Sequence, residues 1–544
     1  MSKLSRLLKP ILNLPPVETH NIVVEKDLNV PMRDRVVLLA DHYTPRGGEG
    51  ELPTVLIRGP YVRQGGFLGP LFAERGYQVL LQDVRGTGGS LGTFDPFRQE
   101  KEDGLDTLEW LEKQPWYSGD VVTFGSSYLG FVQWAIAAEA GPRLGAMSVQ
   151  ITFSDLYDAI FPGGALALQT FMGWVSVIDN PSLLGMVPRI ITGNRKLNRA
   201  LNQLPLSEVD TAATGHKVPY YQEWLQHDSP DDVYWVPASF SEKIGKVSSP
   251  VHLLGGWYDF FLPSMVHDYQ TLRKAGKQPY LTIGPWAHSD FALNKVALKE
   301  ALAFFDAHIK GKTSNLRDQP VLIWVSGAEE WRHYPDFPPP GTQPQHWYLQ
   351  AGGVLAPNLP DDSAPDTYCY DPAHPTPSKG GPLGPGIRVG AGPVANSSLE
   401  ARHDVLVYTT SPLEHELETI GPVYAELFVQ SNREYTDFFV RLCDVDPSGT
   451  STNVCDSLLR VAPGHPAPQK DGTLHLKINL WPAAHLFCCR HSIRLQLSSG
   501  SFPRYARNLG SGEPLIRAKT LQIAEQSVYH DPHRPSAVIL PVQG

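Results

Sequence analysis

Short apolar runs alternate with segments of helical pattern between about residues 53 and 145. The apolar runs read PTVLIRGPY, YQVLLQDVRG, DVVTFGSSY and GAMSVQITF, and stretches such as DGLDTLEWLEKQ and LGFVQWAIAAEAG lie between them. Strands and helices that alternate in this way form βαβ units around a parallel sheet. Two further runs, PVHLLGGWYDF and QPYLTIGPWAH, come much later. The sequence therefore predicts an α/β core whose sheet is interrupted by an insertion.

The rest of the chain divides into regions of different character. Residues 152–240 lack strand alternation and contain helical-looking segments, which predicts a helical cap inserted between core parts 1–151 and 241–334. Residues 335–397 are dense in proline and glycine, as is typical of a domain boundary. Beyond them, short strands alternate with turn residues. We therefore predict that residues 335–544 form a connection followed by an all-β jelly-roll sandwich.

Charge and hydropathy argue against two classes of partner. The net charge of -10, without a basic run, provides no field that would attract nucleic acid. No apolar stretch approaches the roughly 20 residues that a membrane helix needs, so we expect no membrane span. Prolines interrupt the N-terminal 20 residues and no cleavage site follows, which predicts an arm and not a signal peptide. The five cysteines are expected to be reduced thiols of a soluble, cytoplasmic protein.

The stretch TFGSSYLGFVQW, residues 123–134, places a serine between a predicted strand and a predicted helix. In α/β-hydrolases the nucleophilic serine lies on a sharp strand-to-helix turn, where small flanking residues keep the two segments from colliding. Gly125 and Gly130 flank Ser127, although Leu129 stands where the G-x-S-x-G motif has its second glycine. By pattern alone, Ser127 is a candidate nucleophile or an ordinary turn serine.

A serine hydroxyl is a weak nucleophile, so it needs a base and a carboxylate that orients the base. In α/β-hydrolases these follow the serine in the order acid, then histidine, and they should stand just after sheet strands. The two late strands end in GGWYDFF and GPWAHSD, which offer Asp259 and His288. The sequence thus places Ser127, Asp259 and His288 in the expected order at three strand ends.

Acyl transfer also develops an oxyanion, which needs hydrogen-bond donors aimed at it. The backbone N–H of Tyr128, the residue after the nucleophile, is one candidate donor. The second normally comes from the loop after an earlier strand, and LIRGPYVRQG places Tyr61 there. A tyrosine in such a loop is more often a packing residue.

Other titratable residues fit structural roles better. His252 lies in an apolar run and His308 in a helical pattern, Asp268 is expected to be a solvated helix residue, and Asp83 is expected to hold the loop QDVRGTGGS together. That loop lacks a Walker-type lysine, and no His or Cys spacing typical of a metal site occurs near the candidate residues. No metal is predicted, and acyl transfer of this kind needs no cofactor.

Several motifs together resemble the CocE/NonD hydrolases, a family related to α-amino acid ester hydrolases and X-prolyl dipeptidyl peptidases. The motifs are RGPYVR, LQDVRGTGGSLGTF, DTLEWLEKQPWYSGDVVTFGSSYLGFVQW, GGWYDFF, GPWAHS, FFDAHIKG and VSGAEEWRHYPDFP. The resemblance covers nearly the whole chain and implies an α/β-hydrolase core, a helical cap and a C-terminal jelly roll. The family's serine lies in G-x-S-Y-x-G, which residues 125–130 match. It also implies that Asp259 and His288 complete the triad and that Tyr61 and the Tyr128 amide bind the oxyanion.

The resemblance also bears on the substrate. In the amino-ester hydrolases of this family, acidic residues two and three places after the triad aspartate help to hold an ammonium group. Here those places hold Phe261 and Leu262. Because burying a cation without a partner is costly, we expect an uncharged aromatic or aliphatic acyl group. Phe261 is then a candidate wall of the acyl pocket, or a plain core residue.

The sequence therefore predicts a serine carboxylic-ester hydrolase that cleaves a small-molecule ester through an acyl-enzyme. One alternative is an amidase or X-prolyl dipeptidyl peptidase, with Asp155 or Asp158 of the cap as amine anchor. Another is an acyltransferase that uses the same acyl-enzyme. A third is a catalytically silent protein whose β-domain holds carbohydrate. The β-domain also offers surface for a homodimer.

Overall fold

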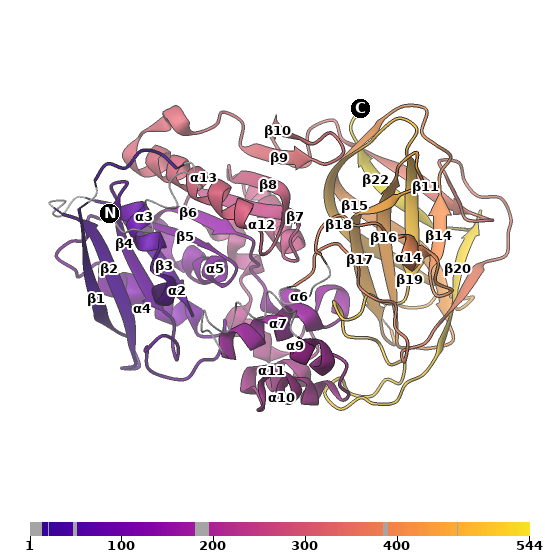
Figure 1. Ribbon diagram of the computed structural model, residues 1–544, viewed down its shortest axis with the longest axis horizontal. Helices are drawn as coiled ribbons and strands as arrows, with labels where there is room; N and C mark the ends of the chain where they lie inside the picture. The colour runs from indigo at the N-terminus through magenta and orange to yellow at the C-terminus, as the bar shows by residue number, and fades with distance from the viewer. Residues whose placement is uncertain (1–13, 20, 47–51, 180–194, 385–389, 465) are drawn as a thin grey trace. The chain divides into compact units, whose positions relative to one another are not determined.

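The computed structural model describes residues 14–19, 21–46, 52–179, 195–384, 390–464 and 466–544 (Figure 1). Most of the predicted N-terminal arm lies outside the described residues. The chain forms two compact units. Unit 1 comprises residues 1–156, 231–256 and 264–321, and unit 2 comprises residues 157–230, 257–263 and 322–544.

Unit 1 is built on a mixed sheet whose strand order is β1-β2-β4-β3-β5-β6-β7-β8. The strands are β1 (Ile22–Pro31), β2 (Val37–Pro45), β3 (Thr54–Gly59), β4 (Gln78–Asp83), β5 (Val121–Ser126), β6 (Leu144–Gln150), β7 (Val251–Tyr258) and β8 (Tyr280–Ala287). The strands from β4 to β7 in this order pair in parallel, whereas β1 and β2 add an antiparallel edge. The predicted parallel sheet is confirmed, and its two edge strands are an addition to the prediction.

Helices cover both faces of this sheet. They are α2 (Val62–Gly65), α3 (Leu68–Ala73), α4 (Glu100–Leu111), α5 (Tyr128–Ala140), α12 (Leu262–Lys274) and α13 (Phe291–Lys310), with 3-10 turns at Gly141–Arg143, Val233–Ala238, Ser241–Lys246 and Thr313–Asn315. In β5, Thr123 Oγ1 donates to Gln133 of α5 at 2.8 Å, while the ring of Phe124 packs 5.0 Å from that of Phe72 of α3. Because successive strand residues point to opposite faces, α3 and α5 lie on opposite sides of the sheet. The central strands are accordingly buried on both faces.

The first part of unit 2 is helical. It contains α6 (Leu156–Ile160), α7 (Leu168–Asp179), α9 (Arg195–Ala200), α10 (Val209–Thr214) and α11 (Pro219–Gln226), with 3-10 turns at Pro162–Gly164 and Leu206–Glu208. Aromatic contacts hold the helices together: the rings of Phe171 in α7 and Trp224 in α11 lie 5.5 Å apart. The segment for which the sequence predicts a cap is thus helical, and its position over the sheet stays a prediction.

The C-terminal part of unit 2 is β-rich (Figure 1). Its elements are β9 (Val321–Val325), β10 (Glu330–Tyr334), β11 (Gln343–Gln350), β12 (Val354–Ala356), β13 (Asp366–Tyr370), α14 (Ser397–Glu400), β14 (Leu406–Thr409), β15 (Leu417–Ser431), β16 (Thr436–Val445), β17 (Ser451–Val461), β18 (Leu474–Phe487), β19 (Ser492–Ser498), β20 (Ala524–Asp531), β21 (Arg534–Pro535) and β22 (Ala537–Val542). In β15, alternate residues from Val423 to Val429 are buried in one hydrophobic core. The predicted C-terminal β-domain is confirmed, and its jelly-roll type stays a prediction.

Candidate active site

Ser127 lies in a sharp turn between β5 and α5. Its backbone adopts φ 58° and ψ −122°, a region that a residue with a side chain rarely occupies. Two hydrogen bonds hold the turn: the Ser127 N–H donates to the carbonyl of Gln150 at 2.9 Å, and Thr152 Oγ1 donates to the Ser127 carbonyl at 2.7 Å. A strained strand-to-helix turn of this kind carries the nucleophile in α/β-hydrolases.

The two glycines that flank Ser127 are required by close packing. A Cβ on Gly125 would stand 2.3 Å from the Cβ of Leu129, and a Cβ on Gly130 would stand 2.6 Å from Cγ2 of Thr152. Both distances are far below van der Waals contact. The glycine at position 130, one place later than in G-x-S-x-G, therefore makes room for Thr152, whose hydroxyl group fixes the turn.

His288 directly follows β8, as predicted. Its Nε2 lies 3.1 Å from Oγ of Ser127, within hydrogen-bond distance. The loop is shaped by Asp290, whose carboxylate accepts the Ala287 N–H at 2.7 Å. A half-buried histidine at this distance can take the proton of the serine hydroxyl.

Asp259 directly follows β7 and is fully buried. Its Oδ1 accepts the N–H of Phe261 at 2.7 Å, and its carbonyl accepts the N–H of Leu262 at 3.1 Å, where α12 begins. These bonds fix the carboxylate at the turn between strand and helix. Asp259 belongs to unit 2 and His288 to unit 1, and the pairing of the two side chains stays a prediction.

Tyr61 stands between β3 and α2, in the loop from which the sequence predicts an oxyanion donor. Burial raises the pKa of its phenol to about 12, so Tyr61 keeps its proton across the neutral range. Such a neutral phenol can donate a hydrogen bond without itself being ionised.

Tyr128 is the first residue of α5, and its buried side chain anchors the turn. The hydroxyl donates to Oε1 of Glu100 at 2.7 Å and accepts the N–H of Phe97 at 3.0 Å. Burial raises the pKa of this phenol well above its usual value. The side chain is thus engaged away from the nucleophile, which leaves the backbone amide as the part of Tyr128 suited to the predicted role.

An ion pair that was not predicted from the sequence lies behind this turn. Arg58 of β3 is buried, and its Nη2 lies 3.2 Å from Oε2 of Glu100. Its Nε also donates to Gln82 of β4 at 2.7 Å. Burial raises the pKa of Glu100, and the charge of Arg58 opposes this shift. The signal was available as a charged residue inside the apolar run TVLIRG.

The structure supports the structural role expected of His252 and contradicts the expectation for Asp268. His252 is buried between the hydroxyls of Ser148 and Thr282, and burial lowers its pKa well below the usual value. Asp83 ends β4, and Ser90 Oγ of the glycine-rich loop that follows donates to its carbonyl at 2.8 Å. The expectation that Asp268 is solvated is wrong. It is fully buried and accepts a hydrogen bond from Ser154 at 2.6 Å.

The two positions that hold acidic residues in the amino-ester hydrolases are apolar and buried here. Phe261 is 5% exposed and Leu262 is 1% exposed. The ring of Phe261 lies 4.5 Å from that of Phe260. No carboxylate is therefore supplied from positions 261 and 262, while the contact of Phe261 with an acyl group stays a prediction.

The described residues contain no group of three or more His, Cys, Asp or Glu side chains that could hold a metal ion. No described helix is both long enough and apolar enough to cross a membrane.

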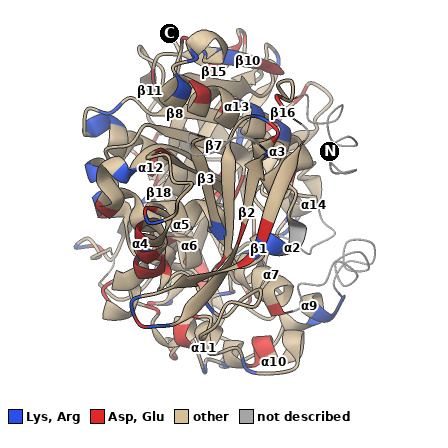
Figure 2. Cartoon of the chain, turned by 90° about the vertical axis from the view of Figure 1, so that its left-hand side faces the viewer, with Lys and Arg blue, Asp and Glu red and all other residues tan. Residues whose placement is uncertain are grey.

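On the face that Figure 2 shows, acidic and basic residues are interspersed, and the first turn of α4 contains the acidic residues Glu100, Glu102 and Asp103.

Comparison with known proteins places the chain in a family. Residues 34–290 match the family model described as X-Pro dipeptidyl-peptidase (S15 family), and residues 315–539 match that of the X-Pro dipeptidyl-peptidase C-terminal non-catalytic domain. The chain is 31% identical to cocaine esterase of Rhodococcus sp. (strain MB1 Bresler), over 96% of this chain and 99% of that protein. It is 25% identical to a putative serine esterase of Mycobacterium bovis, over 88% and 90% of the two chains.

Two solved structures share the whole fold. An α-amino acid ester hydrolase superposes with a TM-score of 0.82 at 23% identity, covering 97% of this chain and 98% of that one. A CocE/NonD family hydrolase from Staphylococcus aureus superposes with a TM-score of 0.71 at 17% identity, covering 96% and 94%. With a curated relative similar over nearly its full length and both S15 domain models matched, the chain belongs to the CocE/NonD family of serine hydrolases.

Proposed function

We propose that the protein is a carboxylic-ester hydrolase that works through an acyl-enzyme on Ser127. The observation that carries the proposal is the 3.1 Å distance between Ser127 Oγ and His288 Nε2, with the serine held in a strained turn. Geometry of this kind activates a weak nucleophile by giving its proton a nearby acceptor. The named relatives, cocaine esterase and a putative serine esterase, support an ester as substrate.

In the proposed reaction Ser127 attacks the ester carbonyl while His288 takes the hydroxyl proton. Asp259 orients the imidazole and stabilises its charged form. The Tyr61 hydroxyl and the Tyr128 amide donate to the oxyanion of the tetrahedral intermediate. His288 then returns the proton to the leaving alcohol, and a water molecule releases the acid by the same steps in reverse.

The acyl group is proposed to be uncharged and aromatic or aliphatic, since residues 261 and 262 are buried and apolar. An amidase or X-prolyl dipeptidyl peptidase would need an amine anchor. Of the two cap candidates, Asp155 already accepts a hydrogen bond from the Ser239 hydroxyl, whereas Asp158 is exposed on α6. The S15 family model keeps this second function open to test. An acyltransferase would differ only in the nucleophile that resolves the acyl-enzyme.

The test compares hydrolysis of p-nitrophenyl butyrate with that of Gly-Pro p-nitroanilide. We expect turnover of the ester only, and Ser127→Ala should lower kcat by a factor on the order of 10⁴ or more while circular dichroism stays unchanged. Ser118→Ala, a half-buried loop residue of unit 1, is the matched control. A pure, folded Ser127→Ala protein that still turns over the ester would sink the assignment, and anilide turnover would favour the peptidase.

Intact-protein mass spectrometry provides an independent readout. A fluorophosphonate should add once to the wild type and not to Ser127→Ala. Labelling of another residue would contradict the proposed nucleophile. We further propose that the protein acts in the cytoplasm, without a cofactor or a nucleic-acid partner.

A further inference from the structure

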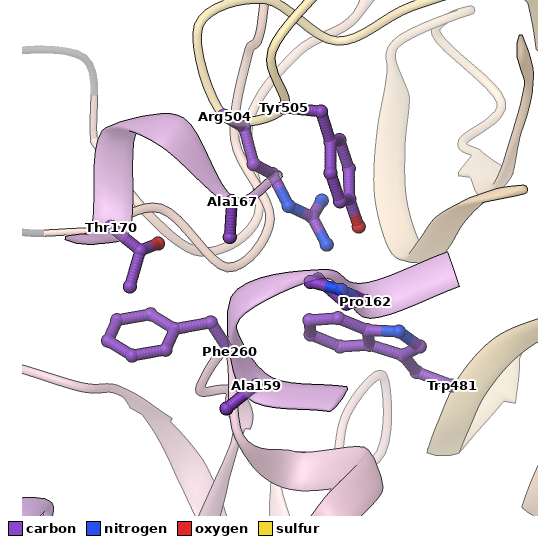
Figure 3. A pocket seen from close by; sticks show the side chains of 8 residues that line it. All are labelled: Ala159, Pro162, Ala167, Thr170, Phe260, Trp481, Arg504 and Tyr505. Carbon is purple, nitrogen blue, oxygen red and sulfur yellow. The ribbon is translucent and has the colours of Figure 1, made fainter. Parts of the chain in front are cut away.

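Unit 2 contains a pocket whose walls are mainly apolar. About 260 Å³ of empty space lies among its walls, a volume that includes open solvent. Figure 3 shows the side chains that line it. Ala159, Pro162 and Ala167 of the helical segment form one wall, and Phe260 and Trp481 contribute aromatic rings. Such walls favour an occupant with an apolar body.

One end of this pocket is polar, because Arg504 and Tyr505 also line it. Both are buried, at 3% and 2% exposure. In Figure 3 the Arg504 guanidinium and the Tyr505 hydroxyl point to the same side, toward Pro162 and Trp481. Nη2 of Arg504 is buried and makes no hydrogen bond of good geometry in the part of the chain that the structure describes, although the Arg504 side chain interacts with that of Tyr505. A buried guanidinium N–H without an acceptor is costly, so this atom marks a place for an acceptor from outside the protein.

The charges around Arg504 do not balance. Arg441 and Arg504 share one carboxylate, that of Asp456: Nη2 of Arg441 lies 2.8 Å from Asp456 Oδ2, and Nη1 of Arg504 donates to Asp456 Oδ1. All three side chains are buried. Within the described ranges, Asp456 is the only carboxylate at ion-pair distance from either arginine. A net positive charge in such surroundings favours a bound anion, which would supply the missing partner.

The guanidinium is also fixed in orientation. It lies 4.8 Å from the ring centre of Trp481 and 4.8 Å from that of Tyr505, as in cation–π contacts. Nη1 is held by Asp456, so the second nitrogen is presented toward the pocket in a set direction. Planar arginine in this setting suits a carboxylate better than the point charge of lysine would.

The backbone at Trp481 supports a functional use of the pocket. Trp481 has φ 77°, which a bulky side chain rarely tolerates, and it lies in β18 where the register with β15 shifts. Its N–H is held by Asn479 Oδ1 at 3.0 Å. Strain of this kind is kept where it directs a side chain to a site, and here it places the indole in the pocket wall.

We propose that this pocket binds a small monocarboxylate with an apolar or aromatic body. The carboxylate lies on Nη2 of Arg504 and the hydroxyl of Tyr505, and the body lies against Trp481 and Phe260. Phe260 follows Asp259 in the chain, so the occupant borders the turn that carries the proposed triad acid. Hydrolysis of an uncharged ester releases a monocarboxylate of this kind. That link between pocket and reaction rests on the proposed function, whereas the binding of a carboxylate in the pocket does not rest on it.

Isothermal titration calorimetry on the wild-type protein tests the binding, with benzoate as the probe and benzamide as its neutral isostere. We expect benzoate to bind at least tenfold more tightly than benzamide, because only the anion completes the charge pairing. Arg504→Lys should raise the Kd for benzoate about tenfold or more, and Tyr505→Phe about threefold. Arg507→Lys, three residues along the same loop and outside the pocket, should leave the Kd unchanged.

Three results would overturn the proposal: no benzoate binding at millimolar concentration, equal binding of benzamide, or a Kd that neither Arg504→Lys nor Tyr505→Phe changes. Thermal melting checks that each variant is folded. Tyr505→Phe keeps the Arg504–Asp456 pair, so it still tests the proposal if Arg504→Lys unfolds. Because calorimetry needs no turnover, these results are separate from the fate of the proposed esterase activity.

Kinetics with two esters distinguish the sources of the carboxylate. If the pocket holds a carboxylate carried by the substrate, Arg504→Lys raises KM for monomethyl terephthalate and not for methyl benzoate. If it holds the released acid, Arg504→Lys raises the inhibition constant of benzoate and leaves both KM values unchanged. Either pattern supports carboxylate binding, and a variant that changes none of these constants contradicts it.

Discussion

Thr152 and Gly130 meet at the turn that carries the candidate nucleophile: a Cβ on Gly130 would stand 2.6 Å from Thr152 Cγ2. The hydroxyl of the same threonine donates to the Ser127 carbonyl at 2.7 Å. One side chain thus both fixes the turn and fills the space that the glycine leaves. This relationship gives a physical reason for the family's glycine at this position.

Gly130→Ala should therefore strain the turn. The added methyl group also approaches the carbonyl oxygen of Gln150 to 3.1 Å, so neither side can yield freely, and we expect a loss of about 1–3 kcal/mol in stability together with a lower kcat. Thr152→Ser in the same protein removes Cγ2 but keeps Cβ, which would stand 2.7 Å from the added methyl group, so it should restore only a small part of both. Gly245→Ala, where a Cβ meets nothing closer than 3.5 Å, is the control. Unchanged melting of Gly130→Ala would contradict the packing argument.

The strand-end positions of Ser127 and His288 could be predicted because a parallel sheet gathers the carboxyl ends of its strands at one edge. Apolar runs reveal such strands, and the residue after each run is then a site candidate. The edge strand β1 was not predicted, because its sequence IVVEKDLNVP is largely exposed and lacks a continuous apolar run. Its pairing with β2 is decided by tertiary contacts.

Residues whose environment depends on distant partners could not be predicted. Asp268 lies on a helix but is buried against Ser154, 114 positions away in sequence. The Arg58–Glu100 pair likewise joins residues 42 positions apart. Periodicity in the sequence identifies the buried face of a helix or strand. It does not identify the polar partner on another element whose hydrogen bond or charge offsets the cost of burying a charged group.

Asp259→Asn should lower kcat by a factor on the order of 10⁴ if Asp259 orients His288, because the amide favours the wrong imidazole tautomer. The Phe261 N–H can still donate to the amide oxygen, so the turn should persist. Asp290→Asn, in the loop of His288, is the comparison and should cost far less. Steady-state kinetics with p-nitrophenyl butyrate measure both, and a loss below tenfold in Asp259→Asn would remove this residue from the triad.

Tyr61→Phe tests the oxyanion donor. Removing one donor typically costs a factor of about 10²–10³ in kcat with little change in KM. Since burial raises the pKa of Tyr61 to about 12, the wild-type kcat should show no loss due to ionisation of Tyr61 up to about pH 10. Tyr117→Phe, a surface tyrosine, is the control. A Tyr61→Phe protein with kcat within threefold of the wild type would exclude the role.

Tyr128→Phe separates the amide of Tyr128 from its side chain. The change leaves the backbone N–H in place, so kcat should stay within about fivefold. Stability should fall by about 1–3 kcal/mol, because Oε1 of Glu100 and the N–H of Phe97 lose their shared partner. Thermal melting and kinetics on the same sample measure the two effects. A loss in kcat as large as that of Tyr61→Phe would instead assign the phenol a direct part in the reaction.

The pair His530 and Asp366 should make the stability of the β-domain depend on pH. His530 Nε2 lies 3.0 Å from Asp366 Oδ2, and this hydrogen bond raises the pKa of His530 and lowers that of Asp366. The histidine's contribution is therefore fully present below its unfolded pKa of about 6.5 and is lost as pH rises through its raised folded pKa. The aspartate's contribution is present above the usual 3.8 and is lost as pH falls through its lowered value. The melting temperatures of the wild type and of Asp366→Asn should thus differ most between about pH 4 and 6.5 and converge toward pH 9. The control is Asp371→Asn, which removes the exposed partner of His374. Its melting temperature should differ less from that of the wild type. A difference between wild type and Asp366→Asn that does not change with pH would show that the ion pair does not form in solution.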